Sequence, residues 1–122
     1  MKTAINYLSI LLLCLFSANA ISGNDFIKKS DVLAHISGNT EKWTKGGAFY
    51  SEDGKLDVVW KGKKSSGTWE VSSEGKLCVV VKMWGDSKEC HQYVNDKGTI
   101  KLYFDGKARV AEIKAGNQLS SL

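Results

Sequence analysis

The sequence contains no proline, only two histidines and only three cysteines among its 122 residues. Without proline, the turns must be made by glycine and Asx residues, and twelve glycines are present. The histidines, His35 and His91, lie in neither a catalytic-triad nor a nucleophile-elbow context. These absences leave no recognisable catalytic motif, so we expect a protein that is not an enzyme.

The one long apolar run lies at the N-terminus and is too short to cross a bilayer. It extends from Tyr7 to Phe16, about half of the ~20 residues that a spanning helix needs. A basic start and a small-x-small motif flank this run, which is the pattern of a secretory signal peptide with cleavage after Ala20. Leu13 before Cys14 argues against a lipoprotein. We therefore expect residues 1–20 to be removed and the protein to be periplasmic or secreted.

Two cysteines, Cys78 and Cys90, remain after this cleavage. In an oxidising compartment an even number of cysteines predicts one disulfide. A zinc site that also uses His91 is the alternative. However, Cys90 and His91 are neighbours that point to opposite faces of a strand, and no convincing fourth ligand exists. The sequence thus predicts a disulfide and neither a metal site nor a cofactor.

The formal net charge of +4 is mild and dispersed, which favours solubility over nucleic-acid binding. Lys61, Lys63 and Lys64, next to Trp60, form the one basic and aromatic group. We interpret it as the solvated tip of a hairpin, with contact to an anionic partner as the alternative.

A short helix is expected after an extended lead-in at residues 21–29. Ser30 is a suitable N-cap and Gly38 a suitable C′ residue. Val32, Leu33 and Ile36 fall on one helical face, while His35 lies on the flank of that face and is expected to be exposed to solvent.

From Asn39 onward, turn signals recur about every 8 to 12 residues between runs rich in β-branched and aromatic residues. This pattern predicts a mainly β single domain at residues 30–122. We expect an antiparallel meander of roughly seven to eight strands that closes into a small barrel or packs as a sandwich. Alternation gives each strand an apolar face, as with Leu56, Val58 and Trp60.

The register of the cysteine hairpin follows from its glycine. If Met83-Trp84-Gly85 forms the turn and Gly85 takes the left-handed conformation, Cys78 falls directly opposite Cys90. A turn at Asp86-Ser87 would instead separate the two cysteines. The first register is therefore predicted, and it places Trp84 at the tip.

The chain also carries a series of short motifs in a characteristic order. They are Ser37-Gly38-Asn39-Thr40, Phe49-Tyr50, Asp53-Gly54, Gly67-Thr68-Trp69, Leu77-Cys78 followed by Cys90, Asp105-Gly106 and Gly116-Asn117. Over about residues 30–119 this order resembles the DUF995 family of small exported bacterial proteins of unknown function. The resemblance implies export and a small β-rich fold, and it carries no catalytic residues.

Three functions remain open at this point. The first is an envelope protein that binds a small ligand or a protein through the candidate contacts Trp43, Trp84, Tyr93, Lys61, Lys63 and Lys64. The second is a secreted inhibitor or immunity-type protein that acts through an exposed loop such as residues 84–88. The third is an enzyme with an unrecognised site. An apolar pocket with inward aromatic side chains would favour the first.

Overall fold

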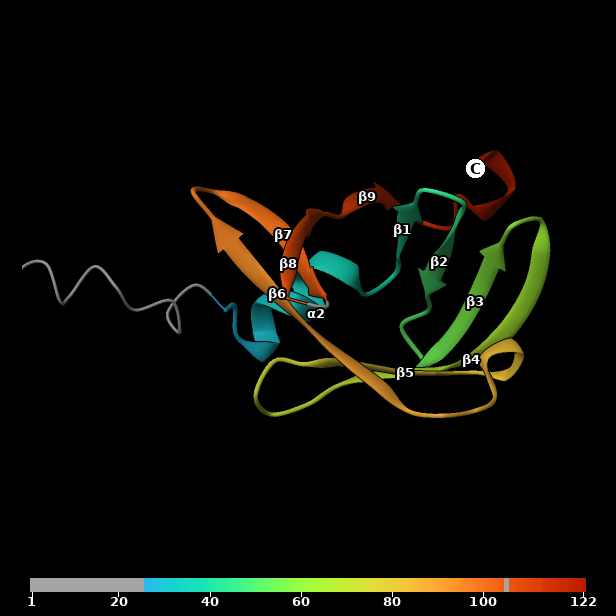
Figure 1. Cartoon of the computed structure of the whole chain (residues 1–122), viewed down its shortest axis with the longest axis horizontal. Coiled ribbons are helices and arrows are strands. Elements are labelled where there is room, and N and C mark those ends of the chain that lie inside the picture. The colour runs from blue at the N-terminus through green and yellow to red at the C-terminus, as the bar shows by residue number, and fades with distance from the viewer. Residues whose placement is uncertain (1–25, 105) are drawn as a thin grey trace, which may run out of the picture.

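In a computed structural model of the protein, which describes residues 26–104 and 106–122, nine antiparallel strands form one sheet. The sheet curls into a nearly closed barrel (Figure 1). The expected signal peptide and Cys14 lie outside the described residues. The elements are α2 (Lys29–Ile36), β1 (Asn39–Trp43), β2 (Gly46–Tyr50), β3 (Lys55–Trp60), β4 (Lys63–Val71), β5 (Leu77–Val81), η2 (Lys82–Trp84), β6 (Glu89–Asp96), β7 (Thr99–Phe104), β8 (Lys107–Val110), β9 (Glu112–Ala115) and η3 (Leu119–Ser121).

The predicted meander is confirmed, with each strand from β1 to β8 paired to the next in sequence. Tight turns with left-handed residues make this possible without proline. Lys61 and Gly62 join β3 to β4 with φ angles of 50° and 79°, which suits the right-handed twist of a hairpin. The lysine cluster therefore does lie at a hairpin tip, as the sequence predicts.

Gly67 forms a corner of the barrel in the middle of β4. This strand pairs with β3 up to Thr68 and with β5 from Gly67 onward. A Cβ atom at Gly67 would come within 1.7 Å of the Val80 carbonyl oxygen. Only glycine permits this close approach of two backbones.

The last two strands close the barrel and raise the number of strands above the sequence prediction. The strand β8 pairs with β7, whereas β9 pairs with β1 at the other edge of the sheet. Only Ala111 separates β8 from β9, so one nearly continuous segment joins both edges. The barrel form, rather than a sandwich, follows from this connection.

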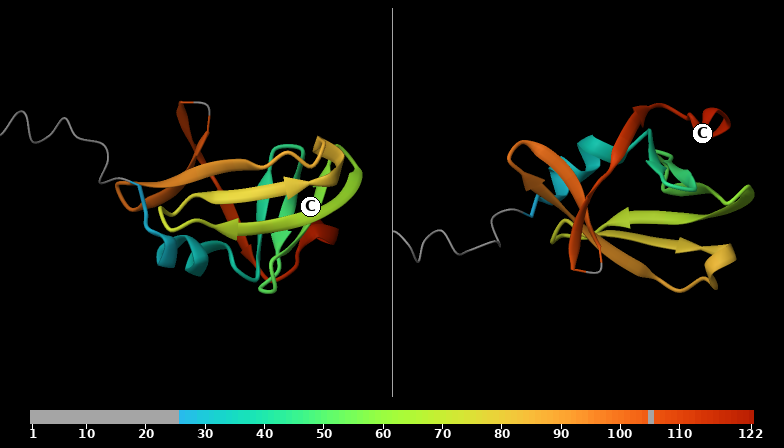
Figure 2. Two further views of the ribbon diagram at one scale, coloured as in Figure 1. Left: turned by 90° about the horizontal axis from the view of Figure 1, so that it is seen from below. Right: turned by 45° about the horizontal axis from the view of Figure 1, so that its top comes forward.

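The helix α2 packs against β1 and β4 through the fully buried Val32 and Ile36. It begins one residue before the expected N-cap, since Lys28 occupies the cap position, so the prediction for Ser30 is wrong. Ser30 lies in the first turn, where backbone N–H groups need no side-chain acceptor if they face solvent. Figure 2 shows α2 away from the C-terminal η3.

The disulfide and its register are as predicted. Cys78 and Cys90 are paired residues of β5 and β6, with a Cα–Cα distance of 4.0 Å. Gly85 has a φ of 86° and caps the η2 turn. The connection is wider than three residues, because β5 ends at Val81 and β6 begins at Glu89. The register nevertheless holds, because the turn remains centred on Trp84.

Candidate functional site: an aromatic cavity with a buried carboxylate

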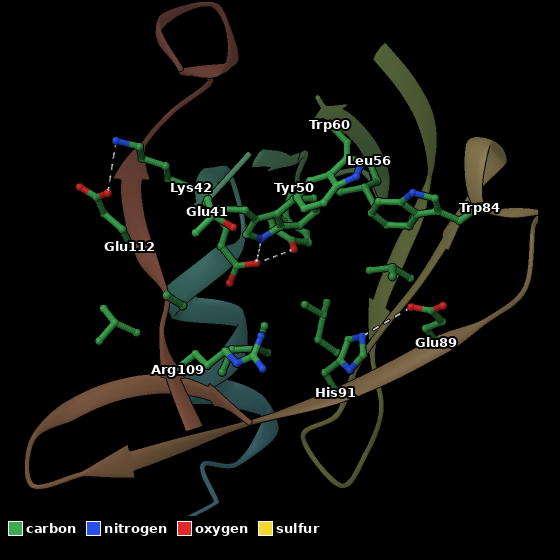
Figure 3. Close-up of a pocket in the computed structure, with 17 residues that line it drawn as sticks. Glu41, Lys42, Tyr50, Leu56, Trp60, Trp84, Glu89, His91, Arg109 and Glu112 are labelled. Atoms are coloured by element: carbon green, nitrogen blue, oxygen red, sulfur yellow. Dashed lines mark hydrogen bonds and ion pairs between the residues drawn. The ribbon is translucent and has the colours of Figure 1, made fainter. Parts of the chain in front are cut away.

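The barrel contains a cavity of about 890 Å³ (Figure 3). Its walls come from strands β1, β2, β3, β5, β6 and β7, from η2, and from β8 and β9 with Ala111 between them. The lining residues are Glu41, Lys42, Trp43, Thr44, Tyr50, Leu56, Trp60, Leu77, Val79, Trp84, Glu89, His91, Leu102, Arg109, Val110, Ala111 and Glu112. Because the disulfide lies on the opposite face of β5 and β6 from Val79 and His91, it supports this wall from outside.

Three tryptophans form one side of the cavity. The Trp43 ring centroid lies 6.1 Å from that of Trp60 and 6.0 Å from that of Trp84. Trp43 and Trp60 end the strands β1 and β3 at neighbouring hairpins, and Trp84 ends the η2 turn. Their indoles give the cavity a large apolar surface.

Glu41 lies at the base of this aromatic wall and is only 1% exposed. Its Oε1 accepts hydrogen bonds from Trp43 Nε1 at 2.7 Å and from the Tyr50 hydroxyl at 3.1 Å, and its Oε2 accepts one from the Tyr93 hydroxyl at 2.6 Å. Burial, together with the charge of Glu41 and the hydrogen bond to it, raises the pKa of both tyrosines well above the usual 10. These hydroxyls therefore remain protonated and act as donors at neutral pH.

A more polar group lines the cavity away from the tryptophans. In Figure 3 the Arg109 and His91 side chains extend into the cavity from β8 and β6. His91 Nε2 lies 3.8 Å from Glu89 Oε2, and Lys42 Nζ lies 3.8 Å from Glu112 Oε2. Charged side chains of both signs therefore surround an otherwise apolar space.

The expectation that His35 is exposed to solvent is wrong. Its ring makes an edge contact with Tyr93, with the centroids 5.6 Å apart, and its Nε2 is buried without a hydrogen-bond partner. Burial lowers the pKa of His35, and the nearby charge of Glu41 raises it by a smaller amount. The helix turns this residue toward the barrel because Ile36 and Val32 must also be buried.

The structure brings together two of the six candidate binding residues, Trp43 and Trp84, in the cavity wall. Tyr93 is fully buried and reaches the site only through Glu41. The remaining three candidates are exposed at the β3–β4 hairpin and do not line the cavity: Lys61, Lys63 and Lys64.

Trp84 is 38% exposed, and its ring packs against that of Trp43 instead of projecting from the loop. Its position therefore suits a cavity wall better than the inhibitory loop considered from the sequence.

Sequence reasoning missed Glu41 and assigned Trp60 to the core. A signal for Glu41 exists, because it lies two residues before Trp43 on one strand and must share its face. Trp60 does follow the apolar face of β3, but it lies at the end of the strand, where that face opens into the cavity.

Neither a metal-binding cluster nor a helix that could span a bilayer is found in residues 26–104 and 106–122. Within these ranges no three histidine, cysteine or acidic side chains are grouped to hold a metal ion. None of the helices in the same ranges has the length and apolarity to span a bilayer.

The chain was also compared with known proteins. No curated protein and no solved structure matches it. A family model described as DUF995, protein of unknown function, matches residues 15–105, which include the strands β1 to β7 and the residues that surround Glu41. The protein therefore belongs to the DUF995 family.

Proposed function

We propose that this protein is an exported, non-enzymatic binding protein that takes a small, largely apolar ligand into its barrel. The observation that carries the proposal is the cavity of about 890 Å³ between Trp43, Trp60 and Trp84. Sites for small molecules are typically concave, measure roughly 300–1,000 Å³ and combine apolar walls with a few polar groups. The cavity has these properties.

The arrangement around Glu41 supports binding over catalysis. A general base must lie within hydrogen-bond reach of the proton that it removes from a substrate. Glu41 already accepts three hydrogen bonds, and two of its donors are tyrosines whose raised pKa keeps their protons in place. The hydrogen bonds that this carboxylate makes are thus with side chains of the protein itself, which supports a role in positioning them.

Export is supported by the N-terminal sequence and by the disulfide between Cys78 and Cys90. Cell fractionation together with N-terminal sequencing of the mature protein tests this part of the proposal. A cytoplasmic protein that retains residues 1–20 would contradict it.

The binding proposal is tested with N-phenyl-1-naphthylamine, an uncharged apolar dye whose fluorescence rises in apolar surroundings. We expect saturable enhancement with the wild type. Trp84→Ala should weaken binding about tenfold, because a well-placed indole contributes on the order of 1–2 kcal/mol.

Tyr103→Ala is the matched control, since Tyr103 is 39% exposed, against 38% for Trp84, and does not line the cavity. Dye affinity should be unchanged in this variant. Absence of saturable enhancement in the wild type, or an equal loss in both variants, would overturn the proposal.

A further inference from the structure

We propose, resting on the function above, that the ligand carries a positive charge. The geometry points to an amphipathic amine whose apolar part contacts the three tryptophans and whose ammonium group is attracted by Glu41.

The first argument is the charge of Glu41 itself. Its three hydrogen-bond donors are all neutral, and it takes part in none of the ion pairs between described residues. A carboxylate that is 1% exposed loses most of its hydration, and neutral donors compensate this loss only in part. A cation in the adjacent cavity would therefore gain a stabilising interaction in a medium of low polarity.

The balance of charges in the wall agrees with this argument. Three carboxylates line the cavity, from Glu41, Glu89 and Glu112, against two permanent cations, Lys42 and Arg109. The chain as a whole has the opposite balance, with a net charge of +4. Lys42 and Glu112 are paired with each other at the exposed edge, and Glu89 lies beside His91, whereas Glu41 is buried. The buried charge in the cavity wall is thus negative, although the chain as a whole is basic.

The aromatic wall supplies the second attraction. Indole faces attract ammonium groups through their quadrupole. Trp43 donates directly to Glu41, so the carboxylate and the aromatic wall meet at one place. The protein itself provides an example at the rim, where Lys61 Nζ stands 5.9 Å from the ring centroid of Trp60. A ligand ammonium group between the indoles and Glu41 would combine both interactions.

The experiment compares three compounds of similar size by isothermal titration calorimetry: 4-phenylbutylamine, 4-phenylbutan-1-ol and 4-phenylbutyrate. At pH 7 they are cationic, neutral and anionic. We expect the amine to bind about tenfold more tightly than the alcohol, and the acid to bind most weakly.

Glu41→Gln should remove the preference for the amine, so that the amine and the alcohol bind to this variant with equal affinity. The control is Glu70→Gln, which removes an equal charge from the exposed outer face of β4, where Glu70 pairs with Lys88. It should leave the preference for the amine intact. The comparison in wild-type protein does not depend on the folding of either variant.

A failure of this inference can be distinguished from a failure of the proposed binding function. Equal affinity for amine and alcohol, or tightest binding of the acid, would overturn the inference and leave the binding function standing. If none of the three compounds binds, the inference is overturned, and the dye experiment then decides separately whether the cavity binds apolar molecules.

Discussion

The hydrogen bond between Tyr93 and Glu41 is expected to hold opposite parts of the barrel together. It joins β6 to β1 across 52 residues of sequence, at a donor–acceptor distance of 2.6 Å. Both groups are buried, and hydrogen bonds to a charged acceptor typically contribute about 1.5–3 kcal/mol. Tyr93→Phe removes only the hydroxyl group. We predict a loss of about 2 kcal/mol in the free energy of unfolding.

Urea denaturation followed by far-UV circular dichroism measures this loss. For a denaturant slope of about 2 kcal/mol/M, the midpoint should fall by about 1 M without a change in slope. Tyr103→Phe is the control, because Tyr103 is exposed and its hydroxyl can bond to water. Its midpoint should remain that of the wild type.

A second comparison tests whether the charge of Glu41 strengthens its hydrogen bond with Tyr93. In a Glu41→Gln background the acceptor is neutral, so Tyr93→Phe should cost less than about 1 kcal/mol. Equal midpoints for Tyr93→Phe and the wild type would refute the reasoning, since the carboxylate would then not stabilise the closed barrel. An equal cost of Tyr93→Phe in both backgrounds would refute the role of the charge.

Three further predictions concern the frame around the cavity. Replacing both Cys78 and Cys90 by alanine should cost about 3 kcal/mol for a separation of 12 residues, and an unchanged melting temperature would contradict it. Because burial lowers the pKa of His35 below the usual 6.5, the unfolded chain binds a proton at this residue more readily than the folded chain does. Stability should therefore fall as the pH drops through that value, and His35→Gln should reduce the fall when melting curves are compared across pH. Gly67→Ala should cost at least ~2 kcal/mol because a backbone carbonyl blocks its Cβ, whereas Gly62→Ala, at a left-handed but open position, should cost about 1 kcal/mol in the same denaturation assay.

Much of the fold could be predicted because its strands carry local signals. Glycine turns separate short alternating runs, and one of these glycines, Gly85, was sufficient to predict the pairing of Cys78 with Cys90. The segment that closes the barrel, residues 107–115, carries no such local signal. Its strands β8 and β9 have four residues each and are joined by Ala111 without a turn residue, so nothing local marks where one ends.

The site was harder to predict because its residues come together only when the barrel closes. An acidic residue in a short strand usually faces solvent, and the tyrosines that bond to Glu41 lie 9 and 52 residues away in sequence. His35 presents a similar case. Helical periodicity placed it on the flank of α2, but only the position of Tyr93 on a distant strand decides that this flank is covered.

The distribution of the tryptophans has a spectroscopic consequence. Trp43, Trp60 and Trp84 report on the contents of the cavity, whereas Trp69, 7% exposed and bonded to the Ser51 carbonyl oxygen, reports on the packed interior. The intrinsic emission of the folded protein is therefore a sum of two signals. A shift of emission at constant circular dichroism would therefore indicate a change in the surroundings of the cavity tryptophans, and the native chain would report the proposed binding without an attached label.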